Sequence, residues 1–290
     1  MKAALALAIG LSLTLGSLQA TGAENSNSAD AEYRKLLADD DALVQDLAQL
    51  SGRRSWSTRS MLRARTRRVE AEYRQFLSEY PTHVRAMVAY GGFLRDFRRV
   101  DEALGWWNKA IAIDPNCAAA YNDIGEVYGS GGRVAEALRL HQKAYELDPA
   151  EPVYRLNWAN TCILYRKDAH NVYGWNNDEI FRRSLEQFRQ ARDLAPQDFE
   201  YSSAYAESFY LMKDPDWQQM YAAWQYCLAQ PLQTNDLQSV YGHLARACMH
   251  LNRFDEAKTW LTKMDAPEIQ SLRRILERNL SERAAGKAPP

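Results

Sequence analysis

Apolar side chains recur along most of the chain in steps of three and four residues, which is the spacing of one face of an α-helix. Residues 31–50 show this clearly, because Tyr33, Leu36, Leu43 and Leu47 fall on a single helical stripe. No segment alternates apolar and polar residues with the period of two that a half-buried β-strand requires. The pattern therefore predicts an all-α fold.

A longer period is superimposed on the helical one. Pro115 and Pro149 stand 34 residues apart, and residues of related size recur at equal distances before each proline. The matching pairs are Met87 and Tyr121, Gly91 and Gly125, Leu94 and Tyr128, Ala103 and Ala137, Trp107 and His141, and Ala110 and Ala144. Small residues let two helices approach closely and large ones fill the space between them, so each unit is expected to bury its apolar face against its neighbours.

The repeated residues resemble the tetratricopeptide-repeat family, whose unit consists of two helices joined by a turn. The turn recurs at residues 98–103, 132–137 and 252–257, and each copy ends in glutamate followed by alanine. The resemblance covers roughly residues 57 to 266. It implies a right-handed superhelical solenoid of helix-turn-helix repeats, closed at both ends by capping helices.

The spacing divides the chain into successive segments. Two complete repeats are expected at 84–117 and 118–151, and Pro196 ends the next unit late enough to leave room for an insertion near 166–178. The other segments are an N-terminal cap with a divergent repeat at 31–83, the repeat with the insertion at 152–198, a degenerate repeat at 199–237, a last repeat at 238–266, a capping helix at 267–283 and a disordered tail at 284–290.

Residues 1–23 have the layout of a secretory signal peptide. Lys2 precedes an uncharged run of 16 residues, with cleavage expected after Ala20 or Ala23 and a flexible linker at 24–30. The run is shorter than the roughly 20 residues that a membrane-spanning helix needs, and an uncleaved anchor is the alternative. We therefore expect a soluble, exported protein, which would be periplasmic in a Gram-negative bacterium and otherwise secreted.

Composition and motifs narrow the function. The formal net charge is −1, whereas a dedicated nucleic-acid-binding protein usually has a basic excess. The five histidines do not form a metal-ligand pattern, and the chain has neither a phosphate-binding P-loop nor a nucleophile elbow. We therefore predict no catalytic residue, no metal and no cofactor, and a binding protein rather than an enzyme.

Four cysteines need an account, because export implies an oxidising compartment. Cys227 and Cys248 are expected on adjacent helices of the array, so one interpretation is a disulfide between them. The favoured interpretation is that the cysteines are buried free thiols, which behave as small apolar residues.

One segment carries a pronounced basic cluster, which consists of Arg53, Arg54, Arg59, Arg63, Arg65, Arg67 and Arg68. One interpretation is contact with anionic lipid headgroups or with an acidic partner. The other is that the preceding helix folds back antiparallel, so that Asp39, Asp40, Asp41 and Asp46 neutralise part of the cluster. We favour the second, and we expect the neutralisation to be incomplete.

The resemblance also implies a binding surface, because in this family the first helix of each repeat lines a concave groove. The matching positions here are Arg85, Val88, Arg95, Asp96, Asn122, Glu126, Ser130, Leu156, Asn160, Ile163, Glu207, Tyr210 and Arg246. A second candidate is the insertion, with Tyr173, Trp175, Asn176 and Asn177. Its aromatic side chains either anchor a partner or fold back, with Trp175 covering Trp158.

Three functional hypotheses follow. The first is an exported adaptor that binds a peptide or helix of an envelope or secreted protein in the concave groove. The second is a structural component of an envelope assembly machine, of the pilus or outer-membrane biogenesis type. An enzyme is the third and least favoured class. The sequence does not identify the partner or the oligomeric state.

Overall fold

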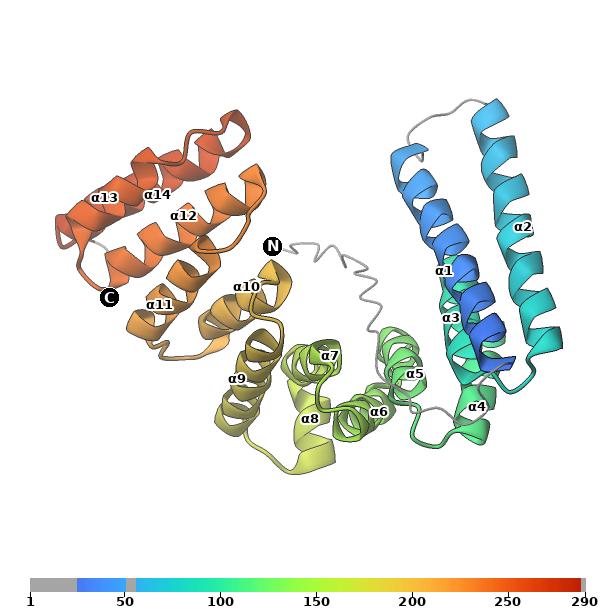
Figure 1. The fold of residues 1–290 in the computed structure, drawn as a ribbon. Coiled ribbons are helices and arrows are strands. Elements are labelled where there is room, and N and C mark those ends of the chain that lie inside the picture. Colours follow the sequence, from blue (N-terminus) through green and yellow to red (C-terminus); the bar gives the residue numbers. More distant parts are fainter. Residues whose placement is uncertain (1–24, 51–55, 288–290) are drawn as a thin grey trace. The chain divides into compact units, whose positions relative to one another are not determined.

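The computed structural model describes residues 25–50 and 56–287, and these residues form fourteen α-helices and two short 3-10 segments (Figure 1). The all-α prediction is confirmed. The chain divides into two compact units, with the boundary between Pro115 and Asn116. The predicted signal peptide at 1–23 lies outside the described residues. Within those residues, no helix has both the length and the apolar character needed to cross a membrane.

Unit 1 consists of two helix pairs, α1 (Asn25–Leu50) with α2 (Trp56–Glu79) and α3 (Val84–Asp96) with α4 (Val100–Ile113). Helices α1 and α2 each carry buried side chains, such as Leu43 and Val69, and between the two helices the Tyr73 hydroxyl donates to Asp40 at 2.6 Å. Residues 25–30 were expected to be a linker, and this expectation is wrong. They belong to α1, because Ala29 is buried and holds the first turns against the unit.

Unit 2 continues with helix pairs and ends in a cap (Figure 1). Its elements are α5 (Ala118–Ser130), α6 (Val134–Leu147), α7 (Pro152–Leu164), α8 (Arg166–Tyr173), α9 (Asn177–Leu194), α10 (Phe199–Ser208), η1 (Phe209–Leu211), α11 (Trp217–Leu228), α12 (Thr234–His250), α13 (Phe254–Thr262), η2 (Pro267–Ile269) and α14 (Gln270–Ala284). The insertion is therefore mostly helical, because its residues form α8 between the two helices of the third repeat.

The two complete repeats share one close contact between their helices. The ring of Trp107 packs on Gly91, and the ring of His141 packs in the same way on Gly125, so the positions matched by sequence spacing make the same contact in each repeat. A Cβ atom on Gly125 would lie 2.9 Å from the His141 ring, and one on Gly91 would overlap the indole. The indole nitrogen of Trp107 also donates to a carbonyl of α3 at 3.1 Å. Glycine is therefore required at both positions by the space that the ring occupies.

The turns within three repeats have the same geometry. Arg98, Gly132 and Asn252 occupy equivalent positions and all have positive φ angles, of 62°, 84° and 57°. The next backbone N–H donates to the carbonyl five residues before it, as in Arg99 to Leu94 at 2.9 Å. This is the Schellman arrangement, in which a residue of left-handed conformation ends the first helix. The recurring turn sequences thus correspond to one recurring structure.

Only part of the apolar stripe of the C-terminal cap is buried. Leu276 is 2% exposed, whereas Leu272 and Ile275 are 40% and 47% exposed. The disordered tail expected at 284–290 is wrong for its first residues. Ala284 is the last residue of α14, and Gly286, with a φ angle of 66°, allows Lys287 to donate back to the helix at 2.8 Å. Residues 288–290 lie outside the described residues.

The glycine–ring contact predicts opposite effects for two neighbouring glycines. Gly91→Ala should destabilise the protein by about 1–3 kcal/mol, because the added methyl overlaps the Trp107 ring. Gly92→Ala is the matched control, since its Cβ would meet no atom within 4 Å and alanine favours the helix by about 1 kcal/mol. Urea denaturation of the two variants measures both effects. A stabilising Gly91→Ala substitution would contradict the proposed packing.

A second prediction concerns stability and pH. Burial lowers the pKa of His141 to about 4, whereas an unfolded histidine takes up its proton near pH 6.5. The unfolded state therefore binds more protons between these values, and stability should fall as the pH drops from about 6.5 to 4, by roughly 3 kcal/mol for this group. His141→Phe should reduce the loss measured by denaturation at successive pH values. An unchanged pH slope would show that His141 does not contribute.

Candidate peptide-binding site

In unit 1, the residues expected to line a groove lie on or near α3. The side chain of Arg95 pairs with Asp96 at 3.2 Å, and the Arg85 guanidinium lies over the Tyr33 ring at 5.2 Å. Val88 is half-buried, and its carbonyl accepts the indole bond described above. These α3 side chains are thus engaged mainly within unit 1 itself.

In unit 2, α5 and α7 are joined by a polar contact between their side chains. The Asn157 amide donates to the side-chain oxygen of Asn122 at 2.9 Å and to Glu126 at 3.1 Å. Asn122 is only 5% exposed, whereas Ser130 at the end of α5 is exposed. Helices α5 and α7, the first helices of these two repeats, are therefore linked by hydrogen bonds between two amide side chains and a carboxylate.

Two predicted groove residues on α7 belong to the core instead. Leu156 and Ile163 are 5% and 7% exposed and pack in the large hydrophobic cluster of unit 2, so their assignment to a groove is wrong. The register of the regular repeats does not carry over to this unit, and one residue along a helix changes the direction of a side chain by about 100°. The exposed side chains of α7 are Asn160 and Leu164, and Asn157 is half-buried.

The C-terminal part of unit 2 holds a denser group of aromatic and cationic side chains. The Tyr210 hydroxyl bonds with Nδ1 of His243 at 2.9 Å, and the His243 ring stacks on Trp224 with the centroids 4.0 Å apart. The Arg246 guanidinium lies over the Tyr210 ring at 5.4 Å. Glu207, on α10, is exposed. The structure thus brings Tyr210 and Arg246 together, as the repeat register implied.

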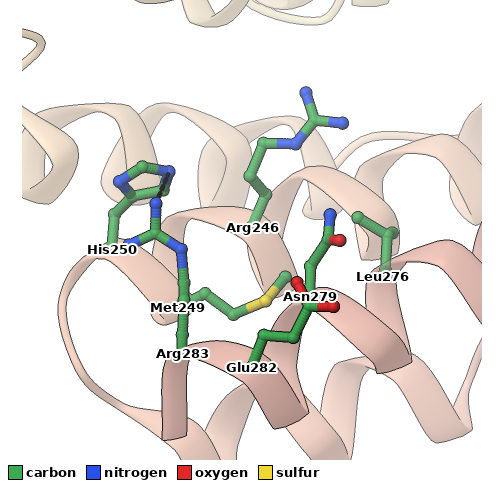
Figure 2. Close-up of a pocket in the computed structure, with 7 residues that line it drawn as sticks. All are labelled: Arg246, Met249, His250, Leu276, Asn279, Glu282 and Arg283. Carbon is green, nitrogen blue, oxygen red and sulfur yellow. Dashed lines mark hydrogen bonds between the residues drawn. The ribbon is translucent and has the colours of Figure 1, made fainter. Parts of the chain in front are cut away.

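A pocket of about 250 Å³ opens between α12 and α14 beside this group (Figure 2). Met249 and Leu276, each 2% exposed, supply its apolar part. Its charged groups are the guanidinium groups of Arg246 and Arg283 and the carboxylate of Glu282. Glu282 also lies 4.0 Å from Arg278, which is not part of the pocket. The full lining is Arg246, Met249, His250, Leu276, Asn279, Glu282 and Arg283.

The charge of this pocket comes from its arginines. Burial, with a smaller effect of nearby guanidinium groups, lowers the pKa of His243 and of His250 to about 4, so both imidazoles are neutral at pH 7. His250 stacks on Trp217 with the centroids 3.5 Å apart, and its Nε2 lies 3.3 Å from the Arg283 guanidinium, which donates to it. Two guanidinium groups beside an apolar wall suit a carboxylate on an aliphatic stem.

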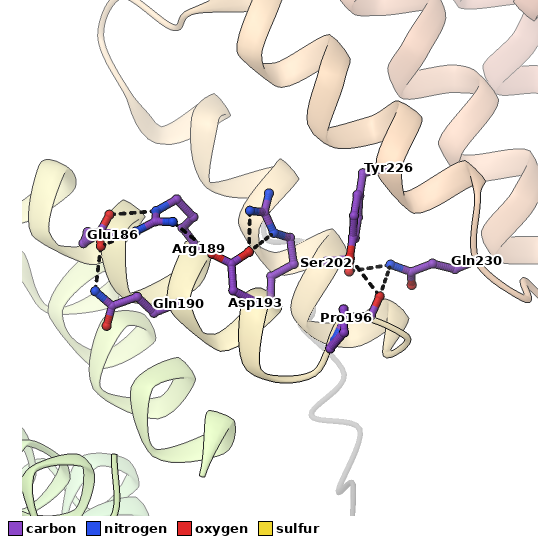
Figure 3. A network of polar contacts seen from close by, with 9 residues as sticks. Glu186, Arg189, Gln190, Asp193, Pro196, Ser202, Tyr226 and Gln230 are labelled. Carbon is purple, nitrogen blue, oxygen red and sulfur yellow. Dashed lines mark hydrogen bonds and ion pairs between the residues drawn. The ribbon is translucent and has the colours of Figure 1, made fainter. Parts of the chain in front are cut away.

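Helix α11, which begins at Trp217, is joined by hydrogen bonds to the turn between α9 and α10 (Figure 3). The Pro196 carbonyl, in the turn between α9 and α10, accepts hydrogen bonds from Tyr226 at 3.1 Å and Gln230 at 3.3 Å. Gln230 also donates to Ser202 at 2.6 Å. These bonds fix α11 against the start of α10, so the degenerate repeat is held in place partly by polar contacts.

The aromatic side chains of the insertion are packed together. The Trp158 indole donates to the Tyr173 hydroxyl at 2.9 Å, and Trp175 stacks on Tyr173 with the ring centroids 4.3 Å apart. Asn176 accepts a bond from the first turn of α9, and Asn177 is the first residue of that helix. These contacts match the alternative in which Trp175 folds back over Trp158, and they leave the insertion less suited to anchoring a partner.

The cysteines are free thiols, so the Cys227–Cys248 disulfide is not formed. Cys162, Cys227 and Cys248 are all fully buried, and Cys117 is half-buried. Burial raises the pKa of both Cys227 and Cys248 to about 12, which keeps these thiols protonated and unreactive at neutral pH. They act as small apolar residues of the core.

Sequence reasoning missed several residues of the pocket and the aromatic group. His243 and His250 lie seven residues apart on α12, and this spacing places them on the same side of the helix as Arg246. That periodicity was the available signal. Their stacking partners Trp217 and Trp224 come from another helix, and Arg283 comes from the cap, so no local pattern connects them.

Two segments of the chain match family models described as tetratricopeptide repeat, at residues 64–116 and 238–264. No curated protein matches the chain in sequence. The solved structures to which it is similar include YrrB, described as a TPR protein with an unusual peptide-binding site, at 14% identity and a TM-score of 0.54, covering 71% of this chain and 97% of that one.

Two further structures are similar at the level of the fold. PilF of Pseudomonas aeruginosa has 15% identity and a TM-score of 0.54, covering 82% of this chain and 99% of that one. PilW, described as a widely conserved type IV pilus biogenesis factor, has 16% identity and a TM-score of 0.52, covering 73% and 92%. The matched segments show that the chain contains tetratricopeptide repeats, and the repeated helix pairs are those of a tetratricopeptide-repeat solenoid.

Proposed function

We propose that this protein is an interaction scaffold that binds a peptide or helix of a partner protein along the first helices of unit 2. The observation that carries the proposal is the pocket between α12 and α14, where Arg246 and Arg283 stand beside the apolar side chains of Met249 and Leu276. A pocket of this size takes one side chain of a partner rather than a small-molecule substrate in full.

The chemistry of the surface suggests how a peptide would lie. The exposed amide of Asn160 on α7 suits hydrogen bonds to a peptide backbone, and the exposed Leu164 offers an apolar contact. Arg246 and Arg283 would then take a glutamate or aspartate side chain, or the terminal carboxylate, of the same peptide. The similarity in fold to YrrB, whose description names a peptide-binding site, supports this proposal.

Export belongs to the same proposal. Residues 1–23 have the charged start, apolar run and small residues of a signal peptide, so the partner would be an envelope or secreted protein. The localisation would be periplasmic in a Gram-negative bacterium.

A second candidate is a structural role in an envelope assembly machine. It is favoured by the similarity in fold to PilW, which is described as a pilus biogenesis factor. The two candidates differ in stoichiometry, because an assembly component has one fixed partner whereas an adaptor binds several weak ligands.

Photo-crosslinking tests the scaffold. A crosslinking residue at Asn160, which is exposed on α7, should capture a discrete protein in intact cells, and mass spectrometry would identify it. Arg139 is the control, because it is exposed on α6, a second helix of its repeat. Equal adducts from both positions, or none from either, would contradict a binding surface on the first helices.

The captured partner allows a test of the pocket. Arg246→Gln should weaken its affinity by about 10-fold or more, because a hydrogen bond to a charged group contributes about 1.5–3 kcal/mol. Arg139→Gln removes the same charge from α6 and should leave the affinity within about 2-fold. Titration calorimetry measures both variants. Equal affinities would place the partner's carboxylate elsewhere.

A further inference from the structure

The arginines near the start of α2 divide into two sets with different surroundings. Arg65 pairs with Asp46, and Arg68 lies 3.9 Å from Asp39 and 2.8 Å from Glu72. The contacts with Asp46 and Asp39 are the pairs with α1 that the sequence led us to expect, whereas Glu72 lies on α2 itself. By contrast, Arg63 and Arg67 are exposed and form no ion pair with any residue in the described part of the chain.

The second set lies on one line along the helix. Trp56, Arg63 and Arg67 are spaced by seven and four residues, so they fall on one face of α2, with Arg59 beside them. We call these four residues the basic stripe. The buried residues of the helix are Val69, Tyr73, Phe76 and Leu77, and the first three of these point away from the line of Trp56, Arg63 and Arg67 by the same periodicity. The basic stripe is therefore directed away from the core of unit 1.

The ends of the stripe make it distinctive. Trp56 is 82% exposed, the highest exposure among the large hydrophobic residues of the described chain. Glu70 is the only acidic residue between 56 and 71, and it is bound by Arg74 and Arg99, each at 2.7 Å. The stripe thus has three exposed arginines, an exposed indole at one end, and no acidic residue of its own.

We propose that the basic stripe binds the surface of an anionic membrane. The stripe extends along a straight helix for about 16 Å, which suits a plane of headgroups. Arginine stems extend their charges toward phosphates, and a tryptophan side chain prefers the interface between headgroups and acyl chains. An acidic protein is the competing ligand. The membrane fits better, because three arginine charges beside one indole match a flat surface with anionic headgroups above apolar acyl chains.

The test is flotation of the full-length chain with vesicles. Vesicles of phosphatidylcholine alone are compared with vesicles in which about a third of the lipid is phosphatidylglycerol, at low and high salt. Any binding through the apolar residues 3–18 should be the same for both lipids, so the readout is the excess on the anionic vesicles. We expect an excess that salt abolishes.

The variant Arg63→Gln/Arg67→Gln should reduce this excess by about 25-fold, since each basic residue contributes about fivefold near an anionic surface. Arg139→Gln/Lys143→Gln is the matched control, because it removes two exposed charges at the same spacing from α6 and should keep the excess. Trp56→Ala should reduce it without changing its dependence on salt.

Three results would overturn the proposal. The first is equal binding to the two vesicle types, and the second is an equal loss in the stripe variant and the control variant. The third is stripe-dependent binding of polyglutamate without any excess on the anionic vesicles, which would assign the stripe to an acidic protein. Because none of these residues lies in unit 2, the outcome is independent of the proposed peptide site.

Discussion

The contact between a glycine and a ring inside each complete repeat is the constraint on which the regular part of the structure depends. Gly91 lies under Trp107 and Gly125 lies under His141, so the two helices of each repeat approach at the same place. Only glycine is small enough at these positions, because the methyl group of an alanine would overlap the ring or crowd it. The recurring turn, ended by a residue of positive φ, then returns the second helix to the same angle.

The proposed binding pocket lies where the structure departs from that regularity. At the boundary between the degenerate repeat and the last repeat, His243 and His250 of α12 stack on Trp224 and Trp217 of α11, so here a ring packs on a ring rather than on a glycine. His243, Arg246 and His250 are half-buried, and the pocket between α12 and α14 lies beside them. Burial keeps His243 and His250 neutral, so any affinity of this site for a carboxylate depends on its arginines and should vary little around pH 7.

The allocation of charges in unit 1 shows why a cluster in sequence is not a cluster in space. Seven arginines within 53–68 suggest one basic patch, but helical geometry sends Arg65 and Arg68 toward the acidic side chains of α1 and Arg63 and Arg67 to the solvent. Exposed ion pairs stabilise the fold only slightly, by about 0–1 kcal/mol each. The ion pairs neutralise only the arginines that point toward α1, so the face of α2 that carries Arg63 and Arg67 remains basic.

The sequence by itself determined the all-α fold, the repeats and their turns, because these depend on residues close together in the chain, such as Gly91 and Trp107. It also indicated that Tyr210 and Arg246 share a face. Only the tertiary structure decided that Leu156 and Ile163 are buried, that the cysteines stay unpaired, and that α14 completes a pocket with α12. The physical reason is that the burial of a side chain depends on which helix covers it, and in an irregular repeat the local pattern does not specify that helix.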